Sequence, residues 1–114
     1  MKLPHADHAI VDRKKVTQYL LCPTHPDGSA KARFFMGFGF TPERWHELAN
    51  ALEAHGKANE VSRVMESPFG TRYNVDGPLA TPSGRAPYVR SAWIIEAESR
   101  SPRLITAHPI WRER

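Results

Sequence analysis

The feature that most constrains the fold is a change in the pattern of apolar residues at Asn59. Before this position, apolar side chains recur every three or four residues, which is typical of amphipathic helices. After it, short runs are separated by Gly, Pro and Ser, which predicts strands joined by turns. This order predicts an α+β fold with N-terminal helices packed on a four-stranded antiparallel sheet. A length of 114 residues predicts one domain over 1–114.

Two helices are expected before residue 40. The first spans 13–21 and begins after Asp12, a residue type that favours the N-cap position. Its apolar face carries Val16, Tyr19 and Leu20. The second is short, begins at Ser29 as its N-cap, and ends near Gly37. Both helices should therefore pack on the sheet through one apolar face.

A third helix opens at Thr41-Pro42, since Thr suits the N-cap and Pro the first helical position. Its apolar residues are Trp45, Leu48, Ala49 and Leu52. Gly56 is the expected C-cap. On this helix, His46 and His55 are expected to lie off the apolar face and to have no chemical role.

Four main strands are expected after the helices. They are Glu60–Glu66, Thr71–Asp76, Tyr88–Ala97 and Arg103–His108, with a brief extended piece at Leu79–Thr81. The last two main strands should form an antiparallel hairpin. Because strand side chains alternate between faces, Thr106 and His108 should point the same way, together with Leu104.

The loop and short helix over 22–40 combine groups that could bind an anion. Two prolines constrain the loop that carries His25, and Lys31 and Arg33 lie in the first turns of the helix. Free N–H groups at a helix start attract anions. These residues indicate a phosphate site. The alternative is an ordinary connector whose cations are simply solvated.

The final strand carries a second group of polar residues. Thr106 can position an oxygen of an anion, and His108 can exchange a proton. The alternative is a strand end where both side chains are satisfied by neighbours. We expect the loop with His25 and the helix with Lys31 to face this strand.

Composition limits the classes of partner and cofactor. Sixteen Lys and Arg against twelve Asp and Glu give a net charge of +4, which favours RNA or an acidic protein as partner. His5 and His8 lack further metal ligands at a recognised spacing, so no metal and no cofactor are expected. Cys22 is the only cysteine and has no partner for an internal disulfide. Without a long apolar run or a signal-like N-terminus, we expect a cytoplasmic chain with no membrane contact.

Several sequence blocks resemble a small bacterial family catalogued as a domain of unknown function. They are Leu3-Pro4, Ala6, Ala9 and Asp12; Leu20-Leu21, Pro23, His25-Pro26, Gly28, Lys31-Ala32 and Phe34-Phe35; Gly39-Phe40 and Trp93; and the ending PRLITAHP at 102–109. The ending is also similar to the closing strand of bacterial toxin ribonucleases of the barnase, EndoU, colicin and RelE fold group. That group has helices before a four-stranded antiparallel sheet.

This resemblance implies a toxin-like endoribonuclease that works without a metal ion. Such cleavage needs a base for the ribose 2′-OH, cations for the crowded phosphate, and an acid for the leaving oxygen. The residues expected to fill the catalytic roles are His25, Lys31, Thr106 and His108. Those expected to bind substrate are Arg33, Arg85 and Tyr73. The competing interpretation is a non-enzymatic basic module that binds RNA or a small cognate antitoxin or immunity protein. The sequence does not indicate an oligomeric state.

Overall fold

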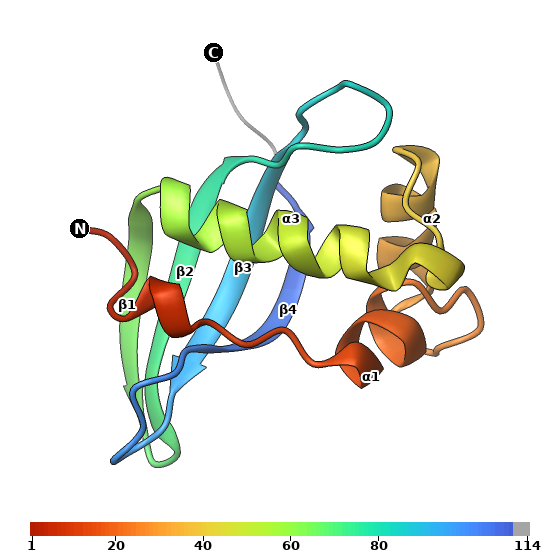
Figure 1. Cartoon of the computed structure of the whole chain (residues 1–114). Coiled ribbons are helices and arrows are strands. Elements are labelled where there is room, and N and C mark those ends of the chain that lie inside the picture. Colours follow the sequence, from red (N-terminus) through yellow and green to blue (C-terminus); the bar gives the residue numbers. More distant parts are fainter. Residues whose placement is uncertain (111–114) are drawn as a thin grey trace.

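Four antiparallel strands form one sheet in which neighbours along the chain are also neighbours in the sheet, in the order β1-β2-β3-β4 (Figure 1). The strands are β1 (Val61–Ser67), β2 (Gly70–Pro78), β3 (Tyr88–Ile95) and β4 (Arg103–Pro109). The computed structural model describes residues 1–110. The helices precede the sheet, so the predicted α+β architecture is confirmed, as is the final antiparallel hairpin. The expected extended piece at Leu79–Thr81 is not a strand.

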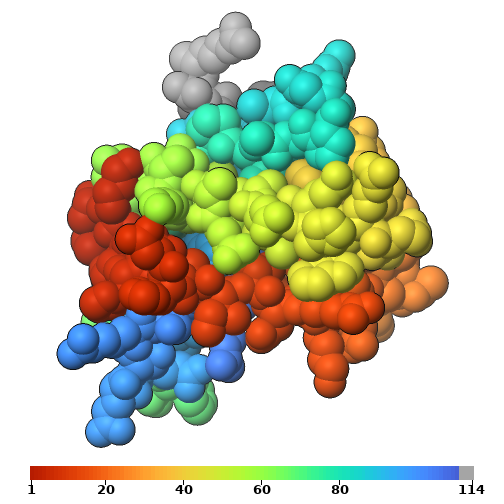
Figure 2. Space-filling view, viewed as in Figure 1, coloured from red at the N-terminus to blue at the C-terminus, as the bar shows by residue number. Residues whose placement is uncertain are grey.

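The helical segments cover one face and one edge of this sheet. They are η1 (Ala6–His8), α1 (Arg13–Lys15), η2 (Val16–Leu20), α2 (Ser29–Gly37), η3 (Pro42–Arg44) and α3 (Trp45–Ala58). The long helix α3 crosses the strands, whereas α2 lies to the side of β4 (Figure 1). Together with the N-terminal segment, these helices make a continuous layer in the space-filling view (Figure 2). Within residues 1–110, no helix has the length and apolar character needed to cross a membrane.

Of the three residues expected at helix N-caps, only Thr41 forms a capping hydrogen bond through its side chain. Thr41 caps η3, because its side-chain oxygen accepts a hydrogen bond from the Arg44 N–H at 3.3 Å. Asp12 precedes α1 but makes no side-chain cap, and its carboxylate instead lies 4.0 Å from the guanidinium of Arg103. Ser29 is the first residue of α2 rather than its cap. Asp12 thus occupies the predicted N-cap position without a capping hydrogen bond, whereas the predicted cap role of Ser29 was wrong.

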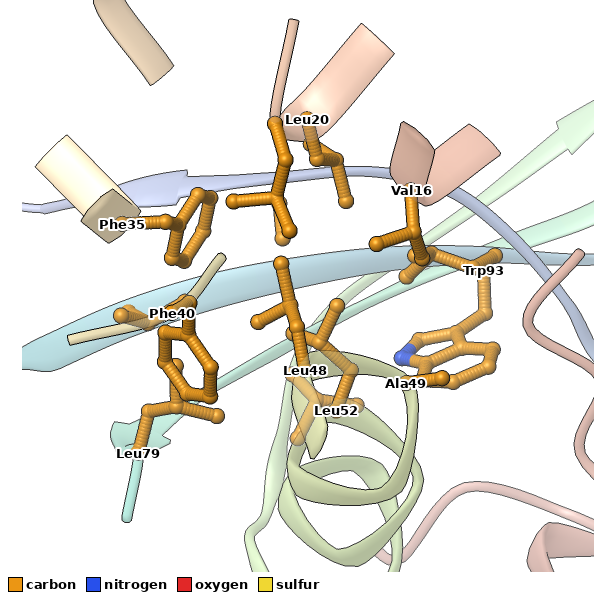
Figure 3. Packing of buried hydrophobic residues seen from close by; sticks show 14 of the residues in the cluster. Val16, Leu20, Phe35, Phe40, Leu48, Ala49, Leu52, Leu79 and Trp93 are labelled. Atoms are coloured by element: carbon orange, nitrogen blue, oxygen red, sulfur yellow. The ribbon is translucent and has the colours of Figure 1, made fainter. Parts of the chain in front are cut away.

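The core lies between α3, η2, α2 and the helix-facing side of the sheet. Leucines of α3 pack against aromatic residues of the α2 region and against side chains of η2 and β3 (Figure 3). The central members are Val16, Leu20, Phe35, Phe40, Leu48, Leu52, Leu79 and Trp93. Since all of these are almost completely buried, this cluster fixes how η2 and α2 sit against the sheet.

The last turn of α3 differs from the prediction. Gly56 lies inside the helix, where a Cβ atom would come 2.8 Å from Cζ2 of Trp93, so its role is close packing and not a C-cap. His55 is 3% exposed and hydrogen-bonds Ser91 and backbone carbonyls. The expectation that His55 lies off the apolar face was therefore wrong. The reason is that α3 continues to Ala58, which lays its final turn directly over β3.

A bulge in β4 decides which of its side chains share a face. Ala92 pairs with Thr106, but the next residue, Trp93, pairs with Leu104, so Ile105 is an extra residue. Leu104 is buried on the helix side with Trp93. Thr106 and His108 lie on the other side of the sheet, which no described helix crosses and which we call the open face. The predicted common face of Thr106 and His108 holds, whereas the placement of Leu104 on it was wrong.

The N-terminal segment ties η2 to the edge of the sheet. The Ile10 N–H donates to the Pro102 carbonyl at 2.7 Å, and the Leu104 N–H donates to the Ile10 carbonyl at 3.0 Å. This short parallel bridge forms along the outer edge of β4. The chain then enters α1 and η2 beside the same strand (Figure 1). Side chains of η2 can therefore reach β4.

Candidate active site

Tyr19 connects the two groups of polar residues at the β4 edge. Its hydroxyl lies 3.2 Å from Oγ1 of Thr106. Its ring meets the ring of His25 edge to face, with centroids 5.0 Å apart. The ammonium groups of Lys31 and Lys15 lie 5.4 Å and 5.2 Å from the centre of the Tyr19 ring. Residues from α1, the loop after η2, α2 and β4 thus surround one phenol. We call Tyr19 and these four residues, Lys15, His25, Lys31 and Thr106, the Tyr19 cluster.

Local backbone geometry holds Tyr19 in this position. The segment η2 is a π-helix whose wide turn is closed by the Leu21 N–H donating to the Val16 carbonyl at 2.8 Å. Val16 and Leu20 are buried in the core, which leaves Tyr19 half-buried at the edge. The loop folds back tightly at Gly28, where a Cβ atom would come only 2.4 Å from the Tyr19 carbonyl oxygen. Glycine at this position allows the loop to return to Tyr19.

The loop around His25 fixes which ring nitrogen carries the proton. The backbone N–H groups of Asp27 and Gly28 both donate to Nδ1 of His25 at 3.0 Å. Because Nδ1 accepts these bonds, the proton of the neutral ring is on Nε2. His25 therefore offers a fixed N–H donor, which is suited to contact an anion. It is not suited to act as a base through Nε2.

His108 has the opposite arrangement. Its Nδ1 lies 3.0 Å from the backbone carbonyl of Pro109, and a carbonyl can only accept a hydrogen bond. The proton of the neutral ring is therefore on Nδ1, and Nε2 carries a lone pair. His108 is thus the imidazole of the pair that can take up a proton from a substrate.

The surroundings of Tyr19 also change its acidity. Burial by itself would raise the pKa of the phenol, but the hydrogen bond with Thr106 and the nearby ammonium groups of Lys31 and Lys15 outweigh it, so the pKa is lowered. A phenol with a lowered pKa is a better proton donor than an ordinary tyrosine. The cluster therefore contains a candidate acid as well as cations.

The three expected substrate-binding residues lie outside the Tyr19 cluster. Arg33 is exposed on α2, and Arg85 is exposed in the loop between β2 and β3. Tyr73 pairs with Trp93 and packs against the core, so it lies on the sheet face opposite Thr106. The structure thus places His25, Lys31 and Thr106 together around Tyr19 and His108 beside Thr106 on the same face, but it does not bring Arg33, Arg85 or Tyr73 to them.

Two members of the Tyr19 cluster were not among the predicted site residues. Tyr19 was expected on the apolar face of the first helix, and Lys15 was not expected to take part in a site. A signal for Tyr19 was available, since a phenol hydroxyl on a predicted apolar face must find a hydrogen-bond partner. The sequence did not contain the identity of that partner, Thr106, which lies 87 residues further along the chain. Nothing in the sequence distinguishes Lys15 from Arg13 and Lys14, the two basic residues that precede it.

An ion pair on the open face lies next to His108. Arg90, which pairs with His108 across the strands, forms two hydrogen bonds with the carboxylate of Asp76 at 2.8 and 2.9 Å. The Arg90 guanidinium lowers the pKa of Asp76. Arg90 is therefore engaged by a carboxylate, whereas within residues 1–110 no carboxylate pairs with the two lysines around Tyr19. In the part of the chain that the structure describes, no three His, Cys, Asp or Glu residues are grouped as metal ligands.

Two comparisons place the chain among known proteins. The model of a family described as a domain of unknown function, DUF6883, matches residues 2–111. No curated protein matches the chain. One chain of the contact-dependent growth inhibition toxin–immunity protein complex from Klebsiella pneumoniae 342 is similar in structure, with a TM-score of 0.72 and 22% sequence identity. The match covers 90% of this chain and 100% of that chain, which shows that the two share a fold.

Proposed function

This chain belongs to the DUF6883 family, and we propose that it is a toxin-like endoribonuclease that cleaves RNA by attack of a 2′-OH on the adjacent phosphate, without a metal ion. The observation that carries the proposal is the gathering of a phenol, two ammonium groups and an imidazole donor beside Thr106, with the His108 base candidate two residues further along the same face. The shared fold with a chain from a toxin–immunity protein complex supports it. RNA as substrate places the activity in the cytoplasm.

His108 and Tyr19 are the proposed base and acid. Nε2 of His108 takes the proton from the 2′-OH, and the 2′ oxygen forms a bond to phosphorus. The bond from phosphorus to the 5′ oxygen then breaks, and the Tyr19 hydroxyl supplies the proton to that leaving oxygen. The products are a 2′,3′-cyclic phosphate and a 5′-hydroxyl. Water or a later substrate restores the two protonation states.

The other members of the Tyr19 cluster are proposed to bind the phosphate. Lys31 and Lys15 supply positive charge, which stabilises the negative charge that builds up on the phosphate oxygens. The Nε2–H of His25 adds a hydrogen bond, since backbone donors already occupy its Nδ1. Thr106 is a positioning residue that holds the Tyr19 hydroxyl. In this assignment His25, Lys31 and Thr106, which were expected to be catalytic, bind the phosphate or position Tyr19.

The rate of RNA cleavage in EDTA tests these roles. We expect His108→Ala to lower the rate about 10²- to 10⁴-fold, because one proton-transfer group is lost. Tyr19→Phe keeps the ring against His25 but removes the hydroxyl, and should lower the rate by a similar factor. His46→Ala is the matched control, since His46 is an exposed histidine on α3. Cleavage that is equally fast in wild type and in the His108→Ala, Tyr19→Phe double variant would contradict the proposal.

A second candidate is a non-enzymatic module that binds a cognate immunity or antitoxin protein, or RNA. The observation that favours a protein partner is that the structurally similar chain belongs to a toxin–immunity protein complex. The same assay separates the two candidates. A protein that retains labelled RNA or a co-purified partner, but leaves RNA intact at high concentration, supports the binding module.

A further inference from the structure

A hollow of about 490 Å³ lies on the open face, where the β1–β2 hairpin turns. It is lined by Ser67, Pro68, Phe69, Arg72, Ile94 and Ile105. The volume is within the range of roughly 300–1,000 Å³ that small-molecule sites occupy. None of these residues belongs to the Tyr19 cluster.

Two of the residues that line this hollow have unusual surroundings. The Phe69 side chain is 77% exposed, the highest exposure among the large hydrophobic side chains of the described residues. The Nε of Arg72 is buried and has no hydrogen-bond partner within the described part of the protein. A buried donor without a partner is costly. An exposed ring beside a guanidinium that lines the same hollow suits a ligand with both a flat surface and acceptor atoms.

The hollow adjoins the proposed site along β4. Ile105 is the extra residue of the β4 bulge and directly precedes Thr106. Arg72 pairs with Ile94, so both lie on the open face together with Thr106 and His108. A chain-like ligand that places a phosphate beside Thr106 can therefore lay its next flat group into the hollow.

We infer that this hollow is a nucleobase subsite, in which Phe69 stacks on one base of the RNA and the guanidinium of Arg72, a residue that lines the hollow, donates to an acceptor on the edge of that base. The inference rests on the proposed function, because it names where the substrate of that site places a base. Ile94 and Ile105 supply the apolar wall against the base. A nucleobase fits better than an aliphatic or phenyl side chain, because these offer no acceptor atom to the Arg72 donor.

Binding of ribonucleoside 3′-monophosphates, measured by calorimetry without cleavage, tests the subsite. Ribose 5-phosphate is the probe that lacks a base. We expect wild type to bind at least one of the four nucleotides more tightly than ribose phosphate. Phe69→Ala should weaken that nucleotide about 5- to 150-fold, the range for loss of one aromatic stacking contact. Arg72→Met should weaken it and reduce the difference among the four bases, whereas ribose phosphate should be unaffected by both changes.

The matched control is Val64→Ala. Val64 is 45% exposed on β1 but pairs with Tyr73, so it faces the helix side of the sheet. It should leave nucleotide binding unchanged. Equal binding of nucleotides and ribose phosphate, or nucleotide binding that Phe69→Ala does not weaken, would overturn the subsite.

The two proposals fail in different ways. RNA cleavage that depends on His108 but shows no change in Phe69→Ala nucleotide binding would remove the subsite and leave the ribonuclease. Nucleotide binding that depends on Phe69, in a protein that leaves RNA intact, would support the subsite and remove the ribonuclease.

Discussion

At the scale of single residues, a buried hydrogen-bond chain fixes the state of His55. The Trp93 indole N–H can only donate, and it donates to Oγ of Ser91 at 2.8 Å. The Ser91 hydroxyl then donates to Nδ1 of His55 at 2.9 Å. The proton on Nε2 is directed at the carbonyls of Gly77 and Val89, at 3.0 and 2.9 Å. Every hydrogen-bond donor in this chain of contacts has an acceptor only when the His55 ring is neutral.

The buried hydrogen bonds of His55 predict that the protein loses stability in mildly acidic solution. Burial lowers the pKa of His55 below its ordinary value. As pH falls below about 6.5, the unfolded state therefore takes up a proton before the folded state does, and the free energy of unfolding falls by up to about 1.4 kcal/mol per pH unit. His55→Gln should be about 1–3 kcal/mol less stable at pH 7.5 and should lose this dependence. Urea unfolding between pH 7.5 and 5.5 measures both.

His46→Gln is the control for that experiment, since it removes an exposed histidine and should keep the wild-type pH dependence. Arg90 lowers the pKa of Asp76 below its ordinary value, so this carboxylate does not account for proton uptake in this range. An unchanged pH dependence in His55→Gln would show that the proton uptake occurs elsewhere.

At the scale of elements, the close approach of α3 to β3 depends on Gly56. The Trp93 side chain is completely buried and cannot move away from a new methyl group at a distance of 2.8 Å. Gly56→Ala gains about 1 kcal/mol of helix propensity, whereas overpacking costs about 1–3 kcal/mol. We expect a net loss of up to about 2 kcal/mol in the free energy of unfolding, measured by urea denaturation.

Gly37→Ala is the matched control, because Gly37 is helical in α2 and a Cβ atom there meets nothing within 4 Å. This change should leave stability unchanged or raise it by up to about 1 kcal/mol. If Gly56→Ala is as stable as Gly37→Ala, the packing of α3 on Trp93 does not limit stability.

The elements themselves could largely be predicted from the sequence, because their signals are local. Apolar period and turn residues place all four strands and the three helical regions close to their observed bounds. Two irregularities could not be predicted in this way. The π turn of η2 and the bulge at Ile105 each depend on contacts with distant segments. The first puts Tyr19 at the sheet edge, and the second puts Thr106 on the open face away from Leu104.

Only part of the composition of the candidate site, and not its arrangement, could be predicted from the sequence. His25, Lys31, Thr106 and His108 could be singled out from their residue types and local context. Their actual hydrogen-bond states depend on the exact backbone conformation, as with the Asp27 and Gly28 N–H groups that turn back onto Nδ1 of His25. The same holds for His55, since its burial follows from where α3 crosses β3.

At the scale of the whole molecule, the hydrophobic core and the proposed functional residues lie on opposite faces of the sheet. The helix side holds the core and the His55 hydrogen-bond chain. The open face, together with the β4 edge, holds the proposed base, acid and nucleobase groups. A net charge of +4 suits a polyanion such as RNA. An RNA strand would thus cross the open face without disturbing the core.

The chemical identity of the RNA ends after cleavage tests the central claim most directly. Cellular RNA is incubated with the wild-type protein in EDTA, and the new ends are identified by mass spectrometry. We expect 2′,3′-cyclic phosphates and 5′-hydroxyls, because a 2′ oxygen attacks the phosphate and His108 and Tyr19 transfer the protons. New 3′-hydroxyl and 5′-phosphate ends, or RNA that stays intact at high protein concentration, would contradict the claim.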